Sequence, residues 1–267
     1  GLVYLDRNYK TFIINTPKLN NYFLFPFSFL KILFLTVKSF FLLKNNNISI
    51  LISTGGYMSL PLCLAAKILG IKIFLIEPNM VIGRANKFFL NFCEKIICYS
   101  KNIISFPNKF ENKLIISNPL IRKKYYEKST KERINKLFTI MVIGGSQGAK
   151  IFDKIIHEVI VNISKIHSLR IIHQTNQKNI DFLKNYYSEN KIENNVFSFD
   201  QNLNIFLSQS DLCITRAGAS SLAELSILNI PFIAIPLPTA KDNHQLENAN
   251  YYKNKDCCWI IEQNYFD

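Results

Sequence analysis

Acidic residues are scarce in the first half of this 267-residue chain. Residues 1–130 hold 5 Asp and Glu against 18 Lys and Arg, whereas residues 131–267 hold 14 of each kind. The whole formal net charge of +13 therefore lies in the first half. This imbalance indicates an anionic partner for that half, such as a lipid surface, a diphosphate or a nucleic acid. A solvated basic face without a partner is the alternative.

The sequence also lacks C-x-x-C pairs and any cluster of metal ligands. Its 6 cysteines lie mostly in apolar runs, and its 4 histidines do not group with them. These absences exclude a disulfide scaffold and a zinc module. We expect buried free thiols in a reducing compartment, no metal and no cofactor.

From residue 48 onward, apolar runs alternate with amphipathic runs. Strands are expected at 48–52, 71–76, 95–99, 137–143, 170–174, 196–199, 212–215 and 232–235. Helices are expected at 58–69, 84–93, 149–163, 180–187, 203–209, 221–228 and 244–252. The pattern predicts an α/β fold with two Rossmann-like domains, 1–120 and 137–267, each built on a parallel sheet. Residues 121–136 have no strand pattern and are expected to form the linker.

One segment, Tyr22–Leu43, is almost wholly apolar but contains Lys31 and Lys38. Each lysine at the centre of a membrane span would cost about 2.5–3.5 kcal/mol, which disfavours a span. On a helical projection Ser28, Lys31, Thr36, Lys38 and Ser39 fall on one side. We expect either an interfacial helix or a helix packed on its own domain, with a true span as the third option. The candidate membrane contacts are Phe27, Leu30, Lys31, Phe34 and Lys38.

Loops that follow strands in parallel sheets are where ligands bind. The first, Ser53–Tyr57, has two glycines before a helix, which suits a phosphate, although tight turns use the same residues. The second, Gly144–Ala149, could hold a diphosphate through Ser146 and Gln147. It is neither a Walker A loop nor a dinucleotide fingerprint, because it lacks Lys-Ser/Thr and because the next strand ends in His173-Gln174.

A third loop, Arg216–Ser221, opens a helix that carries Glu224. Ser221 and Glu224 fit a capping box, so Glu224 has a structural interpretation beside the functional one, in which it accepts bonds from ribose hydroxyls. The polar stretch Pro236–Gln245 could bind sugar hydroxyls through Gln245. Its alternative is a helix N-terminus capped by Asp242 or Asn243.

Together these loops resemble the MurG family of UDP-N-acetylglucosamine transferases, and the match runs in order through nearly all of the chain. The matching groups are Ser53–Tyr57, Leu60–Ala66, Glu77-x-Asn79, Gly83-x-x-Asn86, Asn118-Pro119, Gly144–Ala149, Arg216–Ser220 with Glu224, and Pro236–Gln245 with Asn248-Ala249. The resemblance implies a GT-B fold whose two Rossmann-like domains face a cleft. It also implies transfer of GlcNAc from UDP-GlcNAc to lipid I, giving lipid II with inversion and without a metal.

The resemblance further implies roles for individual residues. Those expected at the donor are Asn79, Ser146, Gln147, Phe199, Arg216, Ala219, Glu224, His244 and Gln245. Those expected at the acceptor diphosphate are Thr54, Gly55, Gly56 and Tyr57. The basic first half would face anionic lipid, which implies a peripheral protein on the cytoplasmic face of the bacterial inner membrane.

The chain departs from the family pattern in three places. The family's His-Glu-Gln-Asn is Ile76-Glu77-Pro78-Asn79 here, and the Arg of its Asn-Pro-Val-Arg is shifted by one, to Arg122. The family's first strand and Gly-rich loop would lie before Gly1, with the His that is its candidate general base, so no catalytic residue is assigned. The family's C-terminal helices would likewise lie beyond Asp267. The sequence therefore leaves open whether this chain is active.

Three other functions compete with this interpretation. A UDP-GlcNAc 2-epimerase of the same fold would need no lipid acceptor, and the basic first half and the Thr54–Tyr57 loop disfavour it. A non-catalytic relative that binds a membrane or a partner is the second. A nucleic-acid binder is the third, and it is disfavoured because the aromatic residues lie in apolar runs rather than among arginines.

Overall fold

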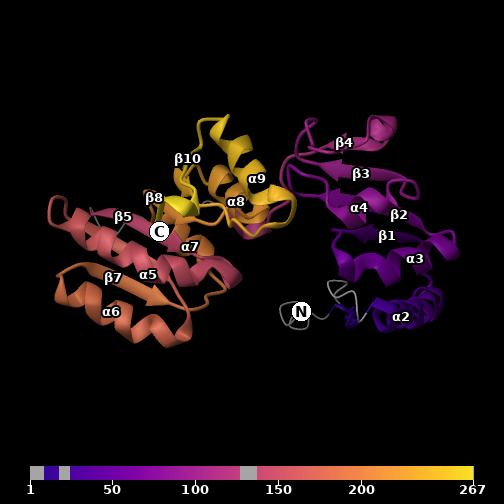
Figure 1. Ribbon diagram of the computed structural model, residues 1–267, viewed down its shortest axis with the longest axis horizontal. Coiled ribbons are helices and arrows are strands. Elements are labelled where there is room, and N and C mark those ends of the chain that lie inside the picture. Colours follow the sequence, from indigo (N-terminus) through magenta and orange to yellow (C-terminus); the bar gives the residue numbers. More distant parts are fainter. Residues whose placement is uncertain (1–8, 18–24, 127–136, 267) are drawn as a thin grey trace. The chain divides into compact units, whose positions relative to one another are not determined.

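The computed structural model describes residues 9–17, 25–126 and 137–266, and only the backbone of residues 25, 26, 145–150 and 266. The chain divides into two compact units, Gly1–Asn118 and Pro119–Asp267. Each unit has its own sheet, and every strand pairing in both sheets is parallel (Figure 1). The prediction of an α/β chain with two parallel sheets is confirmed.

The first unit has a four-stranded sheet in the order β1-β2-β3-β4. Its strands are β1 (Ile50–Ser53), β2 (Lys72–Glu77), β3 (Lys95–Cys98) and β4 (Leu114–Ile116). Its helices are α2 (Phe25–Asn45), α3 (Leu60–Ile68) and α4 (Arg84–Phe89). Strand β4 was not expected, because three residues are too few to show a period in the sequence.

The second unit has a six-stranded sheet in the order β10-β9-β8-β5-β6-β7. Its strands are β5 (Phe138–Ile143), β6 (Leu169–Gln174), β7 (Glu193–Phe197), β8 (Leu212–Thr215), β9 (Phe232–Ala234) and β10 (Cys258–Ile260). Its helices are α5 (Gly145–Ser164), α6 (Ile180–Glu189), α7 (Leu203–Ser208), α8 (Ala219–Ile227) and α9 (His244–Lys253).

The central strand of this second sheet is buried on both faces. Ile140 and Val142 of β5 pack in one cluster with residues of α5 and α6. Met141 and Ile143 pack in another cluster with residues of α8 and α9. A parallel strand covered by helices on both sides is continuously apolar, which is why β5 was detectable from the sequence.

Several element boundaries differ from expectation. Helix α5 begins at Gly145 rather than at 149, so most of the expected second loop is its first turn. Strand β7 covers Glu193–Phe197 rather than 196–199, because an edge strand tolerates polar residues that hide it in the sequence. Of the expected linker, residues 127–136 lie outside the described residues. Its described part packs on the second unit, where Tyr125 is buried in the core.

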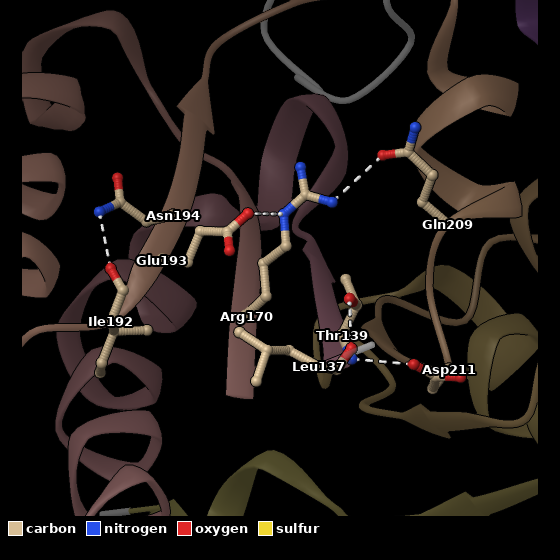
Figure 2. Close-up of polar contacts among 8 residues, drawn as sticks. All are labelled: Leu137, Thr139, Arg170, Ile192, Glu193, Asn194, Gln209 and Asp211. Atoms are coloured by element: carbon tan, nitrogen blue, oxygen red, sulfur yellow. Dashed lines mark hydrogen bonds and ion pairs between the residues drawn. The ribbon is translucent and has the colours of Figure 1, made fainter. Parts of the chain in front are cut away.

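The amino ends of the second sheet's strands carry polar side chains that pair with one another. The Nε atom of Arg170 lies 3.1 Å from Oε1 of Glu193, and its Nη1 donates to Gln209. The carboxylate of Asp211 accepts the backbone N–H of Thr139 (Figure 2). These contacts tie neighbouring strands together at an edge where no ligand residue was predicted.

Candidate functional site

The carboxyl ends of the strands lie level with one another in the second sheet, and in the first sheet β1 ends two residues before β2 does. In the second sheet, Ile143 pairs with both Gln174 and Thr215, and Thr215 pairs with Ala234. In the first sheet, Ser53 pairs with Leu75 and Glu77 pairs with Cys98. Every predicted donor or acceptor residue follows one of these strand ends or lies in the helix after it. The predicted residues therefore lie at the carboxyl ends of the strands of two sheets, one sheet in each unit.

The first candidate loop, Thr54–Tyr57, leaves the end of β1 in a conformation that requires glycine. Gly55 has φ of 78° and Gly56 has φ of 79°, in the left-handed half of backbone space. Thr54 and Gly56 are exposed, while Gly55 and Tyr57 are partly buried. The Gly55 amide already donates to the hydroxyl of Ser53 at 3.1 Å. The loop thus presents an exposed backbone whose shape is fixed by an internal hydrogen bond.

Asn79 follows the end of β2 and is held by the carboxylate of Glu77. Oε1 of Glu77 accepts both the backbone N–H of Asn79 at 3.1 Å and its side-chain amide at 3.0 Å. Glu77 is 2% exposed. The role of this buried acid was not predicted, although the sequence placed it in the same motif as Asn79.

Ser146 and Gln147 lie in the first turn of α5. Their backbone is helical, and their side chains lie outside the described residues, so their contact with a diphosphate stays a prediction. The helix is 20 residues long and follows directly from the central strand β5. Its unpaired N-terminal amides and dipole provide a favourable environment for an anion.

Arg216 follows the end of β8 and is 8% exposed. Its Nη1 donates to the carbonyls of Ile235 and Pro236 at 3.2 and 3.3 Å, and its Nη2 donates to Gln263 at 2.7 Å. Burial lowers the pKa of this guanidinium. Its described contacts join the ends of β8 and β9 to the C-terminal turn. A contact with the nucleotide stays a prediction.

Glu224 lies inside α8 and is 9% exposed. The helix begins at Ala219 after Gly218, and no side chain caps it, so the capping-box interpretation of Ser221 and Glu224 is wrong. Oε1 of Glu224 instead accepts from Nη2 of Arg122 at 3.2 Å. The helix starts two residues earlier than expected, and this places Ser221 within its first turn.

Arg122 was left without a role by the sequence, and the structure brings it to the acid predicted for ribose. Its side chain is 55% exposed, against 11% for Glu224. It also donates to the hydroxyl of the buried Tyr125. Burial raises the pKa of Tyr125, and the nearby Glu224 carboxylate raises it further. No sequence signal pairs residues that lie 102 positions apart.

His244 and Gln245 open α9, and Asn243 precedes them with φ of 53°. The N-cap residue Asn243 makes no side-chain capping hydrogen bond, so the alternative of a cap by Asn243 is wrong, and a cap by Asp242 stays a prediction. The backbone N–H of Leu237 donates to Oε1 of Gln245 at 2.9 Å, leaving its amide NH₂ as the remaining donor group. Phe199, beyond the end of β7, is 71% exposed.

Helix α2 presents a face that the helical projection assigned wrongly. Ser28, Thr36 and Ser39 are buried rather than solvated. They are small enough for close packing, and Thr36 satisfies its hydroxyl on the Ile32 carbonyl at 2.8 Å. All five candidate membrane contacts are exposed and share one stripe at spacings of three and four residues: Phe27, Leu30, Lys31, Phe34 and Lys38. The outward face therefore combines large apolar side chains with two lysines.

Two absences hold for the described part of the chain. None of its helices is long and apolar enough to cross a membrane. No group of three or more His, Cys, Asp or Glu side chains lies close enough to hold a metal ion there.

Comparison with known proteins adds independent findings. Residues 3–98 match the glycosyltransferase family 28 N-terminal domain, and residues 139–267 match the glycosyltransferase family 28 C-terminal domain. A protein of Pelagibacter ubique is 46% identical over 269 residues, covering 100% of this chain and 76% of its own length. It is named UDP-N-acetylglucosamine–N-acetylmuramyl-(pentapeptide) pyrophosphoryl-undecaprenol N-acetylglucosamine transferase.

Solved structures support the fold. The crystal structure of Acinetobacter baumannii MurG matches with a TM-score of 0.72 at 24% identity, over 99% of this chain and 75% of that one. A UDP-GlcNAc 2-epimerase from Methanocaldococcus jannaschii matches with a TM-score of 0.62 at 12% identity, over 98% of this chain and 78% of that one. Both likenesses concern the fold, which is the GT-B fold.

Proposed function

This chain belongs to the MurG family of glycosyltransferases, and from that premise we propose that it transfers N-acetylglucosamine from UDP-GlcNAc to lipid I. The acceptor is undecaprenyl-pyrophosphoryl-N-acetylmuramyl-pentapeptide, and the products are lipid II and UDP. The observation that carries the proposal is 46% identity to a transferase of that name along the whole chain. The epimerases share only the fold at 12% identity, and no observation on the site favours their reaction.

The donor would bind at the carboxyl edge of the second sheet. There Glu224 would accept hydrogen bonds from two ribose hydroxyls, and Arg122 already orients its carboxylate. The uracil would meet backbone near Phe199, whose side chain is exposed. Ala219, Arg216, His244 and Gln245 follow neighbouring strand ends on the same edge.

The reaction forms a bond from an acceptor hydroxyl oxygen to the anomeric carbon, while the bond from that carbon to the UDP oxygen breaks. Negative charge then develops on the leaving diphosphate. Oriented backbone amides at a helix N-terminus stabilise such charge without a metal. The first turn of α5, with Ser146 and Gln147, is the group that we assign to this role.

The acceptor would bind at the carboxyl edge of the first sheet, with its diphosphate at Thr54–Tyr57 and Asn79 toward the transferred sugar. The charge of this unit fits an anionic lipid substrate: Gly1–Asn118 contains 14 Lys and Arg against 4 Asp and Glu. We assign the exposed face of α2 to contact with an anionic membrane surface, since apolar side chains and lysines together are typical of interfacial helices. The protein would then act as a peripheral protein at the cytoplasmic face of the inner membrane.

Transfer is tested by incubating the chain with UDP-[¹⁴C]GlcNAc and a lipid I analogue in detergent micelles, and resolving the labelled lipid. Label in a product of lipid II mobility is expected, together with release of equimolar UDP. Conversion of UDP-GlcNAc to its 2-epimer without label in lipid would contradict the proposal. The variant Glu224→Gln should lower the rate at limiting donor, whereas the exposed Glu189→Gln should not.

Membrane contact is tested by flotation with vesicles that contain anionic phospholipid. Reversing both charges in Lys31→Glu/Lys38→Glu should reduce the bound fraction, because each lysine near an anionic surface contributes about 1 kcal/mol. The matched control reverses Lys154 and Lys184, which belong to the second unit. Equal binding of the α2 variant and the wild type would contradict this role for α2.

A further inference from the structure

Glu77, at the carboxyl end of β2, organises the acceptor edge although no ligand role is assigned to it. Its Oε1 accepts two hydrogen bonds from Asn79. Its Oε2 accepts the backbone N–H of Gly83 at 2.7 Å and the side-chain amide of Asn86 at 2.9 Å. One carboxylate that is 2% exposed thus holds both ends of the segment from Asn79 to Asn86.

Asn86 extends this network to the other candidate loop. Its side chain is 2% exposed, and its Nδ2 also donates to the carbonyl of Ile76 at 3.1 Å. A Cβ atom added to Gly55 would lie 2.8 Å from both Nδ2 and Oδ1 of Asn86. The amide plane of Asn86 therefore lies directly against the α-carbon of Gly55. Any shift of Asn86 would therefore change its packing contact with Gly55 in the loop Thr54–Tyr57.

We propose that Glu77 is a positioning residue that links the sugar-facing Asn79 to the acceptor loop through Asn86 and Gly55. The inference rests on the proposed transferase function. Glu77 acts through other residues because the four hydrogen bonds described above all go to protein N–H groups. Because this carboxylate is 2% exposed, its negative charge is directed toward the protein rather than toward an anionic acceptor.

The variant Glu77→Gln is a sharp probe because each carboxylate oxygen accepts two N–H groups. Whichever oxygen is replaced by NH₂, the new donor faces two donors. Hydrogen exchange is measured first, on peptides that cover 53–59, 78–86 and the strands of the second unit. Faster exchange in both first-unit peptides, with no change in the second unit, is expected. Unchanged exchange in 53–59 would overturn the link to the acceptor loop, whether or not the chain transfers GlcNAc.

Steady-state kinetics then separate positioning from a loss of folded protein. Glu77→Gln should raise the KM for the lipid acceptor and the KM for UDP-GlcNAc about tenfold, with inhibition by UDP unchanged within twofold. Asn86→Ala should raise the KM for the acceptor alone, because the bonds between Glu77 and Asn79 remain. The control Glu94→Gln, exposed in the same unit, should change neither.

A fall in kcat with both KM values unchanged would show only a smaller folded fraction and would overturn the positioning role. Should Glu77→Gln not fold, Asn86→Ala decides through the acceptor KM and the exchange of 53–59. Absence of transfer by the wild type would contradict the proposed function, and the exchange measurement would still decide the coupling. In the double variant the effects on acceptor KM should be less than multiplicative, because both act on one network.

Discussion

In each of the two sheets, the carboxyl ends of the strands are organised by one buried charged residue, and the two residues have opposite charges. In the first unit a buried acid, Glu77, accepts four hydrogen bonds and holds the segment after β2. In the second unit a buried base, Arg216, donates to the ends of β9 and to Gln263. Both side chains form hydrogen bonds with backbone and side-chain atoms around a strand end. The sign of their charge therefore need not be opposite to that of the bound ligand. What matters for the ligand is which polar groups remain available after the internal bonds are made.

This view predicts that loss of Arg216 has the largest effect on stability. Arg216→Met leaves the carbonyls of Ile235 and Pro236 without their donor, and we expect the free energy of unfolding of the second unit to fall by about 2–4 kcal/mol. Urea unfolding monitored by circular dichroism measures this. The control Arg170→Met, at the opposite edge of the same sheet, removes a partly exposed ion pair and should cost about 1 kcal/mol or less. Equal losses in the two variants would contradict the organising role of Arg216.

The second prediction concerns the contact between Gly55 and Asn86. Gly55→Ala introduces a side chain at φ of 78° and displaces a buried amide. Gly70→Ala introduces one at φ of 69° with no atom within 4 Å, so it carries the backbone strain alone. That strain costs about 1–2 kcal/mol. Gly55→Ala should cost about 1 kcal/mol more, from the disturbed hydrogen bonds of Asn86. Equal thermal unfolding midpoints for the two variants would contradict this packing.

The third prediction concerns a buried polar cluster of the second unit whose residues were not among the predicted ligand contacts. Nδ1 of His173 forms a hydrogen bond with the hydroxyl of Tyr187 at 2.8 Å. Nε2 of the same ring lies 3.6 Å from Oδ1 of Asp153. Burial, and to a smaller extent His157, lowers the pKa of His173 below its ordinary 6.5, although Asp153 acts to raise it. Burial raises the pKa of Asp153, but contacts with His173, Thr175 and Asn179 lower it more.

Both folded-state pKa values are lowered, so the unfolded chain takes up protons first as the pH falls. The contribution of His173 to stability should be complete above pH 6.5 and be lost below it, and that of Asp153 should follow below pH 3.8. One proton gives a slope of at most about 1.4 kcal/mol per pH unit. Urea unfolding between pH 7.5 and 5 should show this slope, and His173→Gln should flatten it. The exposed His167→Gln should keep the slope, and an unchanged slope in His173→Gln would contradict the assignment.

The sequence sufficed for the sheets because buried parallel strands are continuous apolar runs. Strand β5, with five of six residues buried, is the clearest case. It did not suffice for β4, which has only three residues, and it misplaced the bounds of β7, where polar residues at the start of the strand obscure it. It located the loops after the strands, because Gly55, Gly56 and the residues from Arg216 to Ser221 interrupt the apolar pattern.

The connections among the site residues were beyond the sequence. Arg122 meets Glu224 across 102 positions, and Glu77 meets Asn86 only because the turn after β2 folds back on the strand end. Similarly, the helical projection of α2 grouped Lys31 and Lys38 with the small polar residues, whereas the structure exposes the lysines and buries the small polar residues. Ser28 and Ser39 instead lie in the packed face, where small side chains allow close approach.

We propose that the strand ends of the two sheets have separate tasks, with nucleotide recognition in the second unit. Isothermal titration of UDP into the wild type, Glu224→Gln and Glu77→Gln distinguishes the two tasks, because UDP lacks the sugar expected near Asn79. Glu224→Gln should weaken binding tenfold or more, about 1.4 kcal/mol, and Glu77→Gln should leave it within twofold. No binding of UDP to the folded wild type, or equal weakening in both variants, would contradict the claim.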